Sequence, residues 1–191
     1  MGLAKHRETM TIADLVADYP FDIELSTTAE TPAKWWHFEV LGIKVYCYNF
    51  QWRQQAIAHH DLHHIVTGYP CTLAGEVQVA AWEFAAGRYP NLCANLFCLP
   101  LITCGIIAMP KRLWTAFRRG RQSHSLFNAA ITPTLLNSKL SDVLVRTRRR
   151  VAPSPRRHDI AAFCGLVSLS LLVTVMPVLL LALAARQLIS A

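Results

Sequence analysis

The chain has 191 residues, of which 53% are hydrophobic and only 16% are charged. Soluble domains commonly carry about a quarter charged residues, so this composition excludes a disordered or low-complexity chain and favours contact with a membrane. The formal net charge of +7 is unevenly distributed. Residues 1–110 hold six basic and ten acidic side chains, whereas residues 111–158 hold twelve basic and one acidic.

The N-terminal third predicts few regular elements. A short helical stretch is expected near residues 10–19, followed by a loop over residues 26–32. Residues 35–52 are rich in aromatic and β-branched side chains, which predicts a strand or hairpin. An aromatic helix interrupted by Gly42 is the alternative interpretation.

The centre of the chain predicts a pair of helices. The first covers residues 53–67 and is ended by Gly68 and Pro70. Thr72 is a suitable N-cap for the second, which runs to about Gly87 before a turn at residues 89–91. Residues 92–109 are almost wholly apolar but contain Pro100. They predict a lipid-facing or lipid-binding helix, with a membrane span as the alternative.

A transmembrane helix is predicted near the C-terminus. Residues 160–185 contain no charged side chain, and about 20 such residues suffice to cross the hydrocarbon core. A buried core helix is the alternative. Arginines are concentrated just before this run, so the positive-inside rule predicts that residues 1–158 are cytoplasmic, at a bacterial inner membrane. The basic block is then expected to face anionic headgroups, and no nucleic acid is expected as a partner. We therefore expect a domain over 1–150, a Pro-containing linker over 151–158 and the membrane helix with a short tail over 159–191.

Four of the eight histidines occur within six residues, His59-His60-Asp61-Leu62-His63-His64. On a helix, His60 and His64 are separated by one turn, and Asp61 lies about 100° from His60. One helix can therefore direct two imidazoles and a carboxylate toward one point. His59 and His63 form a second such pair on the neighbouring face, and the spacing alone does not choose between the pairs.

Glu76 favours the first pair. The short turn predicts antiparallel helices, which brings the last turn of the first helix, with His64, against the first turn of the second, with Glu76. Two neutral imidazoles and two carboxylates would neutralise a divalent cation, and this mixed set suits zinc, manganese or ferrous iron. The alternative is a solvated polar helix face without a metal.

The pattern H-D-x-x-H, eleven residues, then E resembles the coenzyme Q (ubiquinone) biosynthesis protein 4 family. Its flanks agree as well, in Gly68-Tyr-Pro70, in Leu73-Ala-Gly75-Glu76 and in the segment 83–90. The resemblance covers about residues 53–115. It implies a mainly α, membrane-associated and often dimeric protein, with metal ligands His60, Asp61, His64 and Glu76.

The resemblance also implies a function in the biosynthesis of ubiquinone or a related prenylated quinone. The expected reaction is oxidative decarboxylation of a polyprenylated benzoate ring, in which hydroxyl replaces the carboxyl group. The expected cofactor is a divalent metal, zinc first, with iron, manganese or cobalt as alternatives. Expected partners are membrane lipids, the prenylated precursor, other quinone-biosynthesis proteins and a second copy of the chain. Residues 92–109 would line an apolar tunnel for the isoprenoid tail.

Two other functions compete with this interpretation. The box His60-x-x-His63-His64 also resembles membrane di-iron hydroxylases, but those need several such boxes. A non-catalytic lipid-binding scaffold with a structural metal is the second alternative, because the sequence shows no separate acid, base or nucleophile. His59 and His63 are expected to support the metal ligands or relay protons, or else to be exposed surface histidines.

Overall fold

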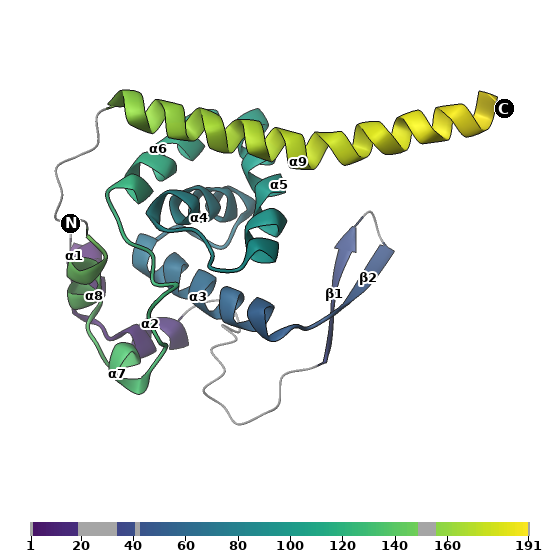
Figure 1. Cartoon of the computed structure of the whole chain (residues 1–191). Helices are drawn as coiled ribbons and strands as arrows, with labels where there is room; N and C mark the ends of the chain where they lie inside the picture. The colour runs from purple at the N-terminus through teal and green to yellow at the C-terminus, as the bar shows by residue number, and fades with distance from the viewer. Residues whose placement is uncertain (1, 19–33, 41–42, 149–155, 191) are drawn as a thin grey trace.

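The structure is a computed structural model, and it describes residues 2–18, 34–40, 43–148 and 156–190. The described part is mainly α-helical, as the sequence predicted, with one two-stranded antiparallel sheet (Figure 1). In chain order the elements are α1 (Gly2–Thr9), α2 (Ile12–Ala17), β1 (Trp35–Val40), β2 (Ile43–Tyr48), α3 (Gln51–Thr67), α4 (Leu73–Ala86), α5 (Leu92–Ala108), α6 (Pro110–Arg121), α7 (Pro133–Leu136), α8 (Leu140–Thr147) and α9 (Arg156–Ser190). The loop expected over residues 26–32 lies outside the described residues.

The two central helices form the predicted helical hairpin. α3 ends because Gly68 adopts a left-handed conformation, with φ of 74°, and its backbone N–H donates to the carbonyl of His64. α4 starts after Thr72, whose side chain accepts a hydrogen bond from the backbone N–H of Gly75 at 3.3 Å. Both boundaries agree with the sequence to within two residues. The hairpin therefore places the end of α3 beside the beginning of α4.

Two groups of buried apolar side chains hold the helices together. One joins α2, α3, α7 and α8 around Ile12, Leu62, Ile65 and Val143. The other joins α4, α5 and α6 around Val77, Ile102 and Leu113, and Phe163 of α9 packs against it. The α3–α4 hairpin lies between these two groups, so burial on both sides fixes its geometry.

α4 and α6 lie close together at Gly120. A Cβ atom built there would lie 2.3 Å from the carbonyl oxygen of Trp82 and 2.8 Å from the Cβ of Ala85. Since a backbone carbonyl cannot move aside alone, we expect Gly120→Ala to destabilise the fold by about 1–3 kcal/mol. Thermal unfolding of the purified protein measures this loss. Gly165→Ala is the control because no atom lies within 4 Å of its built Cβ, and an equal loss there would contradict the close-approach explanation.

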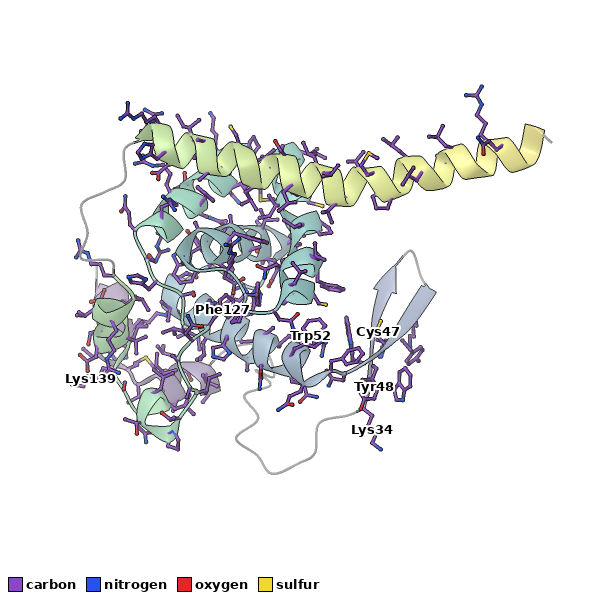
Figure 2. All side chains as sticks on the ribbon, in the orientation of Figure 1. Lys34, Cys47, Tyr48, Trp52, Phe127 and Lys139 are labelled. Atoms are coloured by element: carbon purple, nitrogen blue, oxygen red, sulfur yellow. The ribbon has the colours of Figure 1, made fainter. Side chains whose placement is uncertain are left out.

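Trp35–Val40 and Ile43–Tyr48 form paired β-strands and not the alternative helix. β1 and β2 pair over six residues, from Trp35 with Tyr48 to Val40 with Ile43. The hairpin projects from the helical body, and aromatic side chains on it remain exposed (Figures 1 and 2). Tyr48 points away from the body, whereas Trp52, at the start of α3, lies near α5 (Figure 2).

α9 is long and apolar enough to cross a membrane over Arg156–Leu180, and only 11% of its most apolar window is buried. Its first half lies along α5, where Ser170 donates to the carbonyl of Leu99 at 2.7 Å, and its second half projects beyond the body (Figure 1). Asp159, 2% exposed, pairs with Arg118 and Arg121 of α6. Of the expected linker, residues 151–155 lie outside the described residues, while residues 156–158 form the first turn of α9.

Candidate metal centre

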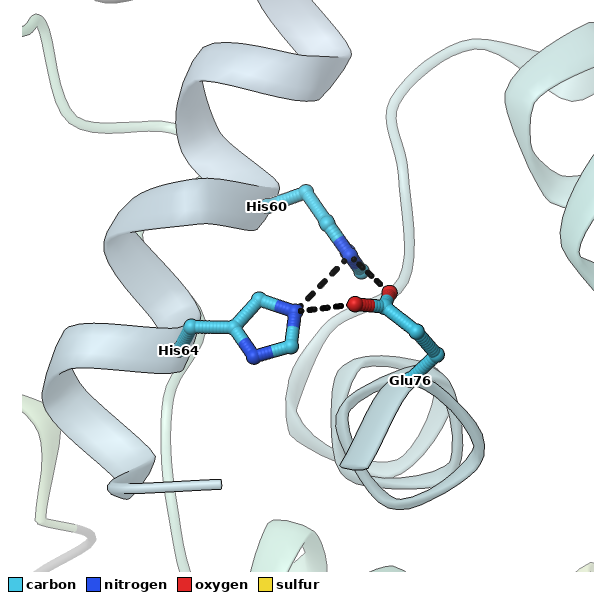
Figure 3. A group of neighbouring side chains, drawn as sticks. All are labelled: His60, His64 and Glu76. Atoms are coloured by element: carbon cyan, nitrogen blue, oxygen red, sulfur yellow. Dashed lines mark hydrogen bonds and ion pairs between the residues drawn. The ribbon is translucent and has the colours of Figure 1, made fainter. Parts of the chain in front are cut away.

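Three side chains converge where α3 meets α4 (Figure 3). His60 and His64 are one turn apart on α3, and Glu76 lies in the first turn of α4. The Nε2 atom of His60 lies 2.9 Å from one Glu76 oxygen, and the Nε2 atom of His64 lies 3.2 Å from the other. The two Nε2 atoms are 3.2 Å apart. This is the arrangement that the spacing of the sequence predicted for these three residues.

The donor set has the dimensions of a metal site. Zinc binds imidazole nitrogen and carboxylate oxygen at about 2.0–2.2 Å, so neighbouring ligand atoms of a tetrahedral ion lie about 3.3 Å apart. The three separations between His60, His64 and Glu76 approach this value. His60, His64 and Glu76 form a group that could hold a metal ion. Three protein ligands would leave a coordination position open, as in catalytic sites.

The Nδ1 nitrogens of both imidazoles, which do not face Glu76, have other partners. The Nδ1 atom of His64 lies 2.9 Å from the carbonyl oxygen of Tyr69, which can only accept, so this nitrogen carries a proton. The Nδ1 atom of His60 faces Glu83, 3.1 and 3.2 Å from its two oxygens. Both rings therefore direct Nε2 toward Glu76. Metal-binding histidines characteristically donate their second N–H in this way.

Glu83 is a fully buried carboxylate on α4, behind the three candidate ligands. It accepts a hydrogen bond from Nδ1 of His63 at 2.7 Å and another from the hydroxyl of Tyr89 at 2.7 Å. The Nε2 atom of His63 in turn accepts from the backbone N–H of Leu126 at 2.8 Å. His63 is therefore a buried, neutral histidine, and the alternative that it is an exposed surface histidine is wrong.

The carboxylates and histidines control each other's charge. Burial disfavours a charged His60, but Glu83 and Glu76 outweigh this and raise its pKa well above the usual value. Burial would likewise raise the pKa of Glu83, yet His60 and His63 hold it at about 2. Glu76 is also held at a pKa of about 2, against its burial, by His60 and His64. Both carboxylates are thus ionised at neutral pH, and the centre favours a cation between them.

Two other predicted residues lie beside the group and not in it. Asp61 follows His60 on α3, and its carboxylate is not among the donor atoms that lie within 4.8 Å of one another. Its role as a fourth ligand stays a prediction. His59 binds two backbone carbonyls, those of Gln55 at 2.7 Å and Ala129 at 2.9 Å. Among the described residues, these hydrogen bonds direct His59 to the backbone and not to the three candidate ligands.

An apolar pocket of about 210 Å³ adjoins the candidate metal centre. His60, Glu76 and Tyr89 contribute polar atoms to its wall, and Arg53 adds a positive charge. The rest is mainly aromatic and aliphatic and includes Trp36, Trp52, Ala56, Phe97 and Leu101. The helix over residues 92–108 thus lines an apolar pocket, and His60 and Glu76 of the candidate metal centre lie in the wall of the same pocket.

Sequence reasoning assigned no role to Glu83 or Tyr89. The signal was a single carboxylate within the run Val79-Ala-Ala-Trp-Glu-Phe-Ala-Ala86, since an acid among apolar residues is buried only when it is paired. It lies seven residues after Glu76, close to two full turns, and so on the same face of the helix.

Comparisons with known proteins identify no relative of this chain, because no protein-family model, no curated protein and no solved structure matches it.

Proposed function

We propose that this chain is a membrane-associated, divalent-metal-dependent protein of ubiquinone or related prenylated-quinone biosynthesis. The observation that carries the proposal is that His60 and Glu76, two of the three candidate metal ligands, lie in the wall of an apolar, aromatic pocket. A ring with a polar group and a hydrocarbon tail fits such a site, because its polar group meets the candidate metal centre while its apolar part leaves water. The resemblance of the His60–Glu76 pattern to the coenzyme Q biosynthesis protein 4 family supports the same assignment.

The reaction that we propose is oxidative decarboxylation of a prenylated benzoate. The ring–carboxyl bond breaks and carbon dioxide leaves, while one oxygen atom of dioxygen becomes the hydroxyl on the same carbon. The second oxygen atom leaves as water, which takes two electrons and two protons from an external two-electron reductant. A bound zinc, iron, manganese or cobalt ion would supply a Lewis acid for the carboxylate or a neighbouring phenolate. Two histidines and a carboxylate with open positions are also the ligand set of non-haem iron oxygenases.

The residues of the pocket would bind and orient the substrate. Arg53 brings a guanidinium to the pocket, where it lies 3.8 Å from the ring centre of Trp36. Its charge suits a substrate carboxylate. Trp52 and Phe97 supply apolar surface that excludes water from the ring and from the first part of its tail.

The test is turnover of a short-chain prenylated 4-hydroxybenzoate by purified protein loaded with zinc, iron or manganese. Formation of the hydroxylated ring and of carbon dioxide, absent in His64→Ala, supports the proposed reaction. A chain that binds metal and the prenylated ring but gives no product would instead be the non-catalytic scaffold. A chain that binds neither metal nor ring would contradict the whole proposal.

The membrane part of the proposal predicts a defined topology. We expect a reporter fused after Ala191 to behave as exported and one fused before Met1 to behave as cytoplasmic, since arginines precede α9 and only Arg186 lies within its last turns. Alkaline phosphatase and green fluorescent protein fusions in bacteria report the two sides. Cytoplasmic behaviour of both fusions would exclude a single crossing by α9.

A further inference from the structure

Glu83 stands out among the buried groups because its side chain has no exposure at all and three polar side chains contact its carboxyl group. A buried carboxylate is costly unless several donors satisfy it. Here three side chains do so: His63, Tyr89 and His60. The contacts of His63 and Tyr89 are both 2.7 Å and fix the carboxylate. The third contact connects it to a candidate metal ligand.

α4 presents two carboxylates to the two edges of one imidazole. Glu76 faces Nε2 of His60 at 2.9 Å, and Glu83 faces Nδ1 at 3.1 Å. A proton held between Nδ1 and Glu83 leaves Nε2 as the nitrogen with a lone pair for a metal. The hydroxyl of Tyr89 also lies 3.1 Å from Nδ1, on the same edge of the ring as Glu83.

We propose that Glu83 is a positioning residue: it holds the Nδ1 proton of His60 and so fixes Nε2 as the metal-binding nitrogen, while His63 and Tyr89 fix Glu83. The inference rests on the metal-binding part of the proposed function and goes beyond it. Glu83 itself is not a ligand, because His60 stands between its carboxylate and the metal position. Its effect is to orient the ring and to raise the electron density at Nε2.

Changes to a partner of a metal-binding histidine commonly weaken the metal site about 10–100-fold. We therefore expect Glu83→Gln, which keeps the shape and removes the charge, to raise the dissociation constant for Zn²⁺ by about that factor. Glu83→Asp keeps the charge on a shorter chain and should recover part of the loss. Tyr89→Phe should cause a smaller loss, since it removes one of the bonds that fix Glu83. Competition with a chromophoric chelator on the full chain in detergent measures all three variants.

Asp159→Asn is the matched control. Asp159 is also a buried acid, but it lies at the start of α9, where it pairs with Arg118 and Arg121 of α6 and not with the candidate metal ligands. We expect the dissociation constant of the Asp159→Asn variant for Zn²⁺ to equal that of the wild type. Unchanged affinity in a folded Glu83→Gln variant would overturn the inference, as would an equal loss in Asp159→Asn.

A measurement on the wild type keeps the inference testable if Glu83→Gln does not fold. Nitrogen-15 NMR of histidine-labelled, zinc-loaded protein distinguishes a metal-bound imidazole nitrogen from a protonated one. We expect His60 to bind zinc through Nε2 and to keep a proton on Nδ1, and zinc on Nδ1 would overturn the inference. Failure of the wild type to bind zinc would instead refute the proposed function, so the two failures are distinguishable.

Discussion

We expect alanine in place of His64 or Glu76 to remove stoichiometric metal from the purified chain, whereas alanine in place of His63 should leave the metal bound. His64 and Glu76 each supply one of the three converging donor atoms. The loss of either side chain leaves two ligands and opens the site to water. Changes to residues that hydrogen-bond to metal ligands weaken metal binding by up to about 100-fold, and we expect the loss of a ligand itself to weaken it by more. Metal content per chain after dialysis, measured by elemental analysis, gives the result directly.

His63→Ala is the decisive comparison because it removes a neighbouring imidazole from the same helix. It should weaken binding through Glu83, which loses its 2.7 Å partner, without emptying the site. Removing a fully buried ring also leaves a cavity, so far-ultraviolet circular dichroism must confirm that each sample is folded. If His63→Ala strips the metal and His64→Ala keeps it, the assignment of the helix face is wrong.

The predicted fourth ligand is tested in the same series. Loss of metal from Asp61→Asn would place Asp61 in the coordination sphere. Retention would limit that sphere to His60, His64 and Glu76, which are the three residues that the structure brings together.

Filling the apolar pocket should abolish ring binding while the metal stays. Ala56 lines the pocket one turn before His60 on α3, so Ala56→Trp introduces an indole beside the candidate metal centre. Excluding a ligand from about 100 Å² of apolar surface costs about 2.5 kcal/mol, which is more than tenfold in affinity. Quenching of tryptophan fluorescence by a short-chain ubiquinone measures binding, since Trp36 and Trp52 line the same pocket.

The control for this variant adds the same side chain elsewhere. Ala108 is exposed at the end of α5 and does not line the pocket. Ala108→Trp should bind the quinone as the wild type does, and both variants should keep their metal. Normal quinone affinity in Ala56→Trp would mean that the ring binds outside this pocket.

The helical hairpin could be predicted from the sequence because its signals are local. Gly68 and Thr72 end one helix and begin the next through their own backbone and side-chain chemistry, and the spacing from His60 to Glu76 then sets which groups meet. The β-hairpin was predicted for the same reason, from aromatic and β-branched residues that suit a strand.

The rest depended on contacts between distant parts of the chain. In the segment 111–148 nearly all the charged side chains are basic and the apolar stretches are short. Its helices α6, α7 and α8 are fixed by packing against α4 and α3. The role of Glu83 likewise depends on residues from two other segments, His60 and His63 of α3 and Tyr89 of the turn before α5. The role of Asp61 as a fourth ligand stays a prediction, since its place in the sequence does not by itself direct a carboxylate toward the group.

The contact between α9 and α5 limits where the body of the protein can sit. A helix of 35 residues is about 52 Å long, whereas the hydrocarbon core is about 30 Å thick. The candidate span Arg156–Leu180 includes Ser170, whose hydroxyl donates a hydrogen bond to the carbonyl of Leu99 in α5. If α9 enters the bilayer over that span, α5 enters with it, and the exposed Leu92, Leu96 and Phe97 face acyl chains. A substrate with a long hydrocarbon tail would then reach the pocket by lateral diffusion within one leaflet, without crossing the aqueous phase.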